Sequence, residues 1–266
     1  MNRALTSLTT CLAAAVLVAL GAAPAYAAVK TETVEYKDGD TICKGFLAYD
    51  DAAKGKRPGV LLVHEWWGLG NQPKKNAQRL AEMGYVAFAV DMYGNGMLTE
   101  KMDEAAKQSS LYKKNPDKSK PRFEAAYNTL KPRAEVDPTR IAATGYCFGG
   151  TIVLDMARLG VDLKGVVSFH GGLATATVND NSTPKASILV CHGADDPFVK
   201  PEEIDAFKKE MEARHAKLDF VAYPGAVHSF TNPEVDKHNL PGAKYNKEAD
   251  EKSWEAMTAF LKKVLG

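Results

Sequence analysis

Short apolar runs rich in β-branched residues recur along the chain, and a turn-forming residue closes each run. Runs of this length and composition predict β-strands. The predicted strands are Val29–Tyr36, Thr41–Tyr49, Gly59–His64, Tyr85–Val90, Ile141–Tyr146, Gly165–Phe169, Ser187–His192 and Leu218–Tyr223. Asp38-Gly39-Asp40 joins the first two runs and is a hairpin signal. From the third run onward the apolar residues are continuous, which is typical of parallel strands buried on both faces.

Helical patterns lie between the later strands. They cover Pro73–Met83, Phe123–Ala134, Gly149–Leu159, Pro201–Ala216 and Lys247–Leu265. The polar stretch Tyr93–Lys120 is broken by Gly94, Gly96 and Pro116, so we expect a loop-and-helix excursion over the sheet edge there. This alternation predicts an α/β fold with a mostly parallel eight-stranded sheet and helices on both faces. No repeat or linker divides the pattern, which indicates a single domain over residues 28–266.

The first 27 residues have the pattern of a secretory signal peptide. Arg3 gives a positive start, Leu12–Ala23 is apolar, and Ala25-Tyr26-Ala27 places small residues where a signal peptidase reads them. The alternatives are a buried helix or a membrane anchor, although the apolar run falls short of the ~20 residues that span a bilayer. We therefore expect cleavage after Ala27, export to the periplasm or the medium, and no membrane anchor on the mature protein.

Charge and cysteine content narrow the function classes. The chain has 34 Lys and Arg against 33 Asp and Glu and no long basic block, so nucleic acid is not an expected partner. Cleavage would leave Cys43, Cys147 and Cys191, and an odd number leaves at least one thiol unpaired in an exported protein. Cys43 and Cys191 lie in predicted strands as core residues, with a disulfide between them as the alternative.

Cys147 stands in Gly145-Tyr146-Cys147-Phe148-Gly149, between a predicted strand and a predicted helix. This is the arrangement of a nucleophile elbow, with cysteine in place of the usual serine. Glycines flank the nucleophile because side chains there would collide with the neighbouring strand and helix. The turn places the sulfur at the positive end of the helix, which favours a thiolate. The alternative is a glycine-rich turn that carries an inert buried cysteine.

The order of later residues favours the catalytic interpretation. In α/β-hydrolases, an acid and then a histidine follow the nucleophile along the chain. Asp195 and Asp196 follow the strand Ser187–His192, and Asp196 is favoured because it lies further out, where it can face a histidine. His228 follows the last strand, at the sheet edge where the active-site groups of parallel sheets gather. The sequence therefore predicts a triad of Cys147, His228 and Asp196.

The remaining histidines carry weaker signals. His215 and His238 stand among polar residues and are expected at the surface, whereas His64, His170 and His192 end strands and are expected to be structural or to line the pocket. No H-x-x-x-H or H-E-x-x-H spacing occurs in the sequence, so we expect no metal site.

The turn after the third predicted strand reads His64-Glu65-Trp66-Trp67-Gly68. In α/β-hydrolases this turn donates one backbone N–H to the oxyanion hole, and the residue after the nucleophile donates the other. These would be the N–H groups of Trp66 and Phe148. Glu65 has two interpretations here: a carboxylate that holds or accepts the thiol proton, or a salt-bridged glutamate without a catalytic role.

Together these motifs resemble the dienelactone hydrolase family. The resemblance extends from about Thr33 to Leu261, in the family's order, and rests on G-Y-C-F-G-G at 145–150, H-E-x-x-G-L at 64–69, D-M-Y at 91–93, G-A-x-D-x-x-V at 193–199, H-S-F at 228–230, Y-N at 245–246, S-W at 253–254 and F-L at 260–261. It implies an α/β-hydrolase fold, a carboxylic ester or lactone substrate, no cofactor and often a monomer. It also implies that Glu65 is the family's extra carboxylate, which engages the resting thiol.

Residues beside these motifs are expected to bind the substrate: Trp67, Tyr93, Asn95, Ser229, Phe230 and Asn232. Members of the resembled family that cleave dienelactones hold the substrate carboxylate with two arginines, and Asn95 and Asn232 occupy those positions here. Asparagine offers a neutral amide where arginine offers a charged fork. Lys101 or Lys200 could supply a charge but not the planar fork. The sequence therefore predicts a preference for neutral esters or lactones over dienelactone carboxylates.

Two other functions stay open. The scaffold could serve as a binding or sensing module with Cys147 as a vestige, although the intact triad argues against this. A thiol redox protein would need a resolving cysteine at C-x-x-C spacing, which the sequence lacks.

Overall fold

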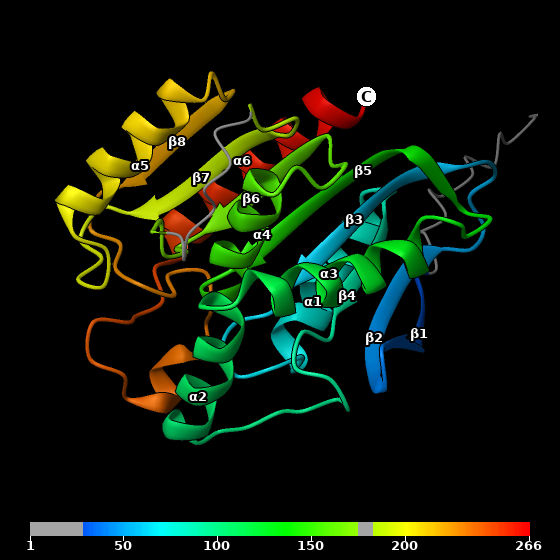
Figure 1. Ribbon diagram of the computed structural model, residues 1–266, viewed down its shortest axis with the longest axis horizontal. Coiled ribbons are helices and arrows are strands. Elements are labelled where there is room, and N and C mark those ends of the chain that lie inside the picture. Colours follow the sequence, from blue (N-terminus) through cyan, green and yellow to red (C-terminus); the bar gives the residue numbers. More distant parts are fainter. Residues whose placement is uncertain (1–28, 175–182) are drawn as a thin grey trace, which may run out of the picture.

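In the computed structural model, which describes residues 29–174 and 183–266, eight strands form one sheet (Figure 1). The strands are β1 (Val29–Asp38), β2 (Thr41–Asp50), β3 (Arg57–Val63), β4 (Val86–Val90), β5 (Val136–Tyr146), β6 (Gly165–Phe169), β7 (Ser187–Gly193) and β8 (Leu218–Tyr223). They lie in the order β1-β2-β4-β3-β5-β6-β7-β8. β1 and β2 form an antiparallel hairpin and β2 runs antiparallel to β4, whereas all later neighbours are parallel.

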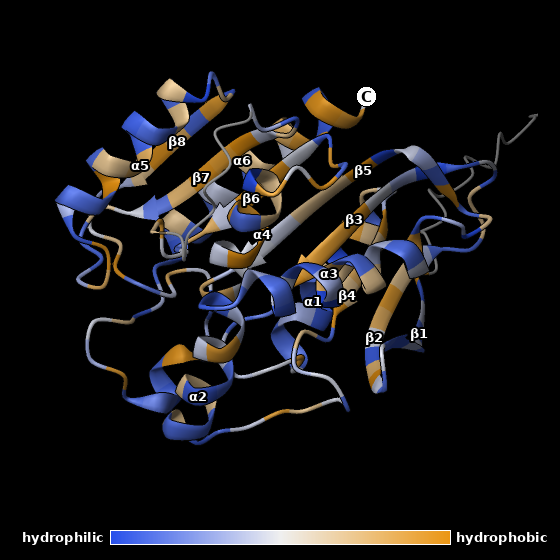
Figure 2. Cartoon of the chain, viewed as in Figure 1, coloured by the Kyte–Doolittle hydropathy of each residue, from blue (hydrophilic) through white to orange (hydrophobic). Residues whose placement is uncertain are grey.

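Helices cover both faces of this sheet. They are α1 (Asn71–Glu82), α2 (Met102–Lys113), α3 (Pro116–Leu130), α4 (Phe148–Arg158), α5 (Pro201–Ala213) and α6 (Lys247–Leu265), with a short 3-10 helix η1 (Val235–His238). Successive residues of a strand point to opposite faces. Leu61 of β3 therefore packs in the core with α3, α4 and α5, and Leu62 packs in the core with α1 and α6. Figure 2 shows β3 and β7 largely in the hydrophobic colours.

The predicted fold class is confirmed: the chain folds as a single α/β domain with a mostly parallel eight-stranded sheet. Gly39 in the hairpin and Gly84 after α1 both have positive φ angles, 55° and 91°, which glycine adopts at no steric cost. The predicted signal peptide, residues 1–27, lies outside the described residues.

The largest differences from the predicted elements lie between residues 93 and 140. α3 begins at Pro116 instead of Phe123, because proline suits the first helical turn, where its missing N–H has no helical acceptor. It also ends at Leu130 instead of Ala134. β5 begins at Val136 instead of Ile141, since Val136 pairs with β3 on the far side of a register shift.

Cys43 and Cys191 are buried, free thiols. Cys43 lies in the core with α3, α4 and α5, whereas Cys191 lies in the core on the opposite face of the sheet. This separation rules out a disulfide between them in the folded chain. No helix in the described part of the chain is both long and apolar enough to span a membrane.

Candidate active site

Cys147 is the single residue between β5 and α4 and has an unusual backbone, with φ 53° and ψ −113°. The two flanking glycines make this turn possible. A Cβ at Gly145 would lie 2.1 Å from the carbonyl oxygen of Gly149, and a Cβ at Gly149 would lie 2.3 Å from that of Val63. The steric prediction for the glycines is therefore confirmed. The turn puts the thiol at the N-terminal, positive end of α4.

His170 helps to hold the strained turn. The N–H of Cys147 donates to Phe169 O at 3.0 Å and to His170 Nδ1 at 3.1 Å. Burial, followed by the charge of His228, lowers the pKa of His170 well below its usual range, so the ring is neutral. Because its Nδ1 accepts a hydrogen bond, its Nε2 carries the proton and donates to Thr231 Oγ1 at 2.8 Å. The sequence indicated only that His170 would be structural or line the pocket.

The structure brings Cys147, His228 and Asp196 together. His228 Nε2 lies 3.0 Å from Cys147 Sγ, and His228 Nδ1 lies 2.8 Å from Asp196 Oδ2. The second oxygen of Asp196 accepts the N–H of Phe198 at 2.9 Å, which fixes the carboxylate. Asp195, the alternative acid, is exposed.

His228 is held in the charged form. Burial alone would lower its pKa, but the charge of Cys147 and the hydrogen bond that His228 donates to Asp196 outweigh burial and raise the pKa to about 10. The Asp196 side chain is fully buried and that of His228 is 10% exposed, so water screens these interactions little. The pair is suited to a thiolate beside an imidazolium.

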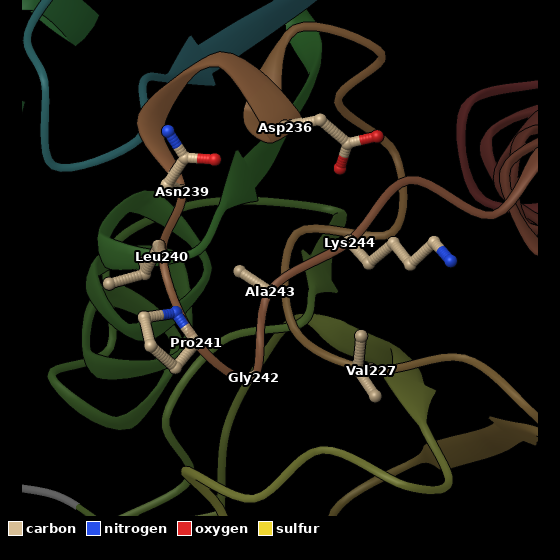
Figure 3. Close-up of a pocket in the computed structure, with 8 residues that line it drawn as sticks. All are labelled: Val227, Asp236, Asn239, Leu240, Pro241, Gly242, Ala243 and Lys244. Atoms are coloured by element: carbon tan, nitrogen blue, oxygen red, sulfur yellow. The ribbon is translucent and has the colours of Figure 1, made fainter.

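A segment that we call the strap (residues 239–244), whose side chains are labelled in Figure 3, fixes the backbone of His228. The N–H of His228 donates to Gly242 O at 3.2 Å, and the N–H of Lys244 donates to His228 O at 3.0 Å. Figure 3 shows the side chains of Leu240 and Lys244 extending in opposite directions from the strap. Leu240 lines the cavity at Cys147. No sequence motif pointed to this segment.

A cavity of about 290 Å³ opens beside Cys147. Its lining is mainly apolar and comes from Trp66, Lys113, Cys147, Phe148, Thr151, Gly172, Phe198, Val199, His228 and Leu240. A cavity of this character suits a small organic molecule with few polar groups.

The two residues predicted for the oxyanion hole, Trp66 and Phe148, both line this cavity. Phe148 is the first residue of α4, so no helical carbonyl can accept its N–H. Two contacts hold the turn that carries Trp66. Tyr93 Oη donates to Trp66 O at 2.8 Å, and His64 Nδ1 lies 2.5 Å from Glu65 O.

Glu65 lies beside the site but is bonded to Asn232. Its Oε2 accepts the Nδ2 of Asn232 at 2.7 Å, and its buried Oε1 has no partner in the described part of the chain. Burial raises its pKa, against smaller opposing effects that begin with the bond from Asn232. Glu65 and Asn232 line a separate cavity of about 170 Å³. Within the described residues, the Cys147 thiol is hydrogen-bonded to His228 and not to Glu65.

None of the predicted substrate-binding residues lies in the lining of the cavity at Cys147. Trp67 stacks on His238 in the second cavity, with ring centroids 4.2 Å apart. Phe230 is buried against His170. Asn95 is exposed, and its N–H donates to Ile42 O in the β1–β2 hairpin.

The other three, Asn232, Tyr93 and Ser229, are buried. Asn232 is bonded to Glu65, and Ser229 has a φ of 54°. The lining residues that the sequence did not indicate are Lys113, Thr151, Gly172, Phe198 and Leu240. Phe198 lies within the motif at 193–199, and Thr151 directly follows the motif at 145–150, so their positions could have suggested these two. Across residues 29–174 and 183–266, no three His, Cys, Asp or Glu side chains gather as metal ligands do.

Comparison with known proteins finds similarity to dienelactone hydrolases. A sequence model described as "Dienelactone hydrolase family" matches residues 43–265. The solved structure of a dienelactone hydrolase-like promiscuous phosphotriesterase from metagenomic libraries is 36% identical, with a TM-score of 0.86 over 90% of this chain and 99% of the other. A second solved structure, named m3DLH, is 37% identical, with a TM-score of 0.87 over 90% of this chain and 100% of the other. A protein of Aquifex aeolicus (strain VF5), whose name designates it provisionally as a carboxymethylenebutenolidase, is 27% identical over 88% of this chain and 99% of its own length.

Proposed function

This chain belongs to the dienelactone hydrolase family and is an ester or lactone hydrolase, and we propose that Cys147, His228 and Asp196 carry out its reaction. The observation that supports this assignment is the continuous contact from Cys147 Sγ to His228 Nε2, at 3.0 Å, and from His228 Nδ1 to Asp196 Oδ2, at 2.8 Å. A nucleophile, a base and an acid that orients the base are what acyl transfer requires.

The proposed reaction has two steps. The Cys147 thiolate attacks the ester carbonyl, and the N–H groups of Trp66 and Phe148 stabilise the oxyanion. The carbon–oxygen bond then breaks, and His228 gives its Nε2 proton to the leaving alkoxide, which leaves a thioester on Cys147. In a lactone the leaving group stays tethered. His228 next takes a proton from water, which attacks the thioester and releases the acid and the thiolate.

Substitution of the nucleophile tests this proposal. Cys147→Ala should abolish hydrolysis of p-nitrophenyl acetate with little change in melting temperature, and Cys147→Ser should retain little activity because a hydroxyl ionises far less readily than a thiol. Cys43→Ala is the matched control and should stay active. Iodoacetamide should inactivate the parent enzyme. Full activity of Cys147→Ala, or resistance of the parent to iodoacetamide, would remove Cys147 from the mechanism.

The proposed substrates are esters or lactones other than dienelactone carboxylates. At the positions that would hold such a carboxylate, Asn95 is exposed outside the cavity and Asn232 is bonded to Glu65. Each charge-assisted hydrogen bond that an arginine would have provided is worth about 1.5–3 kcal/mol. We expect kcat/KM for a dienelactone acid to fall below that for its methyl ester. A clear preference for the acid would contradict this.

We also propose that the mature enzyme is exported and begins at Ala28, on the basis of the segment Met1–Ala27. That it is a monomer is what the family resemblance implies. Protein recovered from the periplasm or the medium should have Ala28 as its first residue, and its mass in solution should be that of one chain. Active protein that keeps Met1 in the cytoplasm would contradict export.

A further inference from the structure

Lys113, at the end of α2, lines the cavity at Cys147. Among the described residues that line this cavity, Lys113 is the only lysine or arginine. The side chain is half-buried. Lysine in the last turn of a helix is common, because it interacts favourably with the carbonyl end of the helix dipole. That effect does not require a position in the cavity, and Lys114, the next residue, is exposed.

Tyr112 anchors this end of α2. Its ring is buried and stacks on Tyr93 with centroids 5.9 Å apart, and its hydroxyl donates to Tyr93 O at 3.4 Å. The guanidinium of Arg122 lies over the same ring, 5.5 Å from its centroid. Because Tyr112 is fixed toward the core, the backbone of Lys113 has a defined position beside the cavity.

No carboxylate compensates Lys113. None of the residues that line the cavity is acidic, and no ion pair within residues 29–174 and 183–266 includes Lys113. Asp196 and Glu65, the two carboxylates described at the site, have other partners, since Asp196 is bonded to His228 and Glu65 is bonded to Asn232. The cavity lining therefore presents the ammonium group of Lys113 without a carboxylate partner, in a mainly apolar surface.

We propose that Lys113 selects esters that carry a carboxylate away from the scissile carbonyl. This inference rests on the proposed function of the same site and adds a class of substrate to it. It differs from the dienelactone case, because Lys113 reaches the cavity from α2, whereas Asn95 and Asn232 lie outside the cavity lining. An ammonium group held beside apolar walls forms a charge-assisted hydrogen bond with a substrate carboxylate that reaches it.

The test uses monophenyl esters of glutaric, adipic and pimelic acids, which place the carboxylate at increasing distance from the ester. Each ester is compared with a matched phenyl ester in which a primary amide replaces the free carboxylate, and the rate of phenol release gives kcat/KM. The parent enzyme should favour the acid over the amide about tenfold for at least one chain length. Lys113→Met should reduce this ratio to about one, and Lys113→Arg should restore most of it. Lys114→Met, on the same helix, should keep the parent ratio.

Two results would overturn the role of Lys113. One is a parent enzyme that prefers no acid in the series. The other is a Lys113→Met enzyme in which the rates for acid and amide fall equally, because that pattern indicates a structural role. Failure of the proposed function would give a different result. The parent would release no phenol from the phenyl esters that carry the amide, or Cys147→Ala would release phenol from them at the parent rate.

Discussion

The substitution Asp196→Asn removes the charge beside His228 and leaves the shape of the site almost unchanged. In the parent, Asp196 Oδ1 accepts a hydrogen bond from the N–H of Phe198 at 2.9 Å, and asparagine keeps an oxygen that can do the same. Its amide nitrogen would then face His228 Nδ1. Because an amide nitrogen donates, Nδ1 would have to accept, and the proton of a neutral ring would move to Nε2. In the proposed mechanism, a His228 protonated at Nε2 cannot take a proton from the water that hydrolyses the thioester.

The size of the effect follows from the contact that is lost. The Asp196 side chain is fully buried at 2.8 Å from Nδ1, so its bond to the imidazolium is a charge-assisted hydrogen bond worth about 1.5–3 kcal/mol. A free energy of ~1.4 kcal/mol corresponds to one pH unit. The pKa of His228, about 10 in the parent, should therefore fall by about one to two units. The wrong tautomer should also lower turnover by about 10²–10⁴-fold.

The assay is kcat/KM for phenyl acetate between about pH 6 and pH 10. The neighbours of His228 raise its pKa, so the imidazolium is present below that pKa and is lost as the pH rises through it. The alkaline limb of the parent profile should therefore lie near the top of the range. In Asp196→Asn the limb should move to lower pH, and the maximum should fall by orders of magnitude.

Asp195→Asn is the matched control, because Asp195 is exposed and one residue away. It should change kcat/KM by less than about twofold and leave the alkaline limb in place. The reasoning is refuted if Asp196→Asn keeps the parent alkaline limb, or if Asp195→Asn is the more damaging change. Either result would assign the orienting carboxylate to another residue.

Three further substitutions test the surroundings of the triad. Gly149→Ala places a Cβ 2.3 Å from Val63 O, so it should lower both melting temperature and kcat, with an overpacking cost of about 1–3 kcal/mol in chemical denaturation. Burial raises the pKa of Glu65, so the folded state loses stability as the pH rises from the pKa of the unfolded chain through the pKa of the folded protein. Glu65→Gln should remove this loss. A difference in melting temperature between Glu65→Gln and the parent that does not grow with pH would contradict the raised pKa. Asn232→Ala should cost about 1–3 kcal/mol of unfolding free energy at pH 8 by leaving Glu65 without its donor, and the cost should shrink in the Glu65→Gln background.

The sequence predicted the strands well because each buried strand is a short, continuous apolar run. It predicted α6 to its exact bounds, Lys247–Leu265, for a similar reason, since that helix has a long apolar face against the sheet. It predicted α3 less well. Pro116 locally indicates an interruption, yet it begins that helix, and a second proline, Pro121, lies inside it. The packing of Phe123 and Ala126 against the sheet outweighs these local signals.

The site shows the same division between local and long-range information. The elbow around Cys147 is a local pattern, and the acid and the histidine follow strands in a fixed order, so all three could be placed from the sequence. The bond between Asn232 and Glu65 joins residues far apart in the chain, and no local pattern predicts it. Lys113 is similar, because its place in the cavity depends on how α2 docks through Tyr112.

The position of Cys147 in the sheet explains how its strained backbone persists. A non-glycine residue at φ 53° and ψ −113° costs on the order of 1–3 kcal/mol. Contacts that form only in this conformation must offset that cost. Two of them are the bonds from its N–H to Phe169 O and to His170 Nδ1, at the end of the adjacent parallel strand β6. The close approach of Gly149 to Val63 ties α4 to β3 on the other side. Since β5 lies between β3 and β6, both neighbours brace the turn, which an edge strand with one neighbour could not achieve.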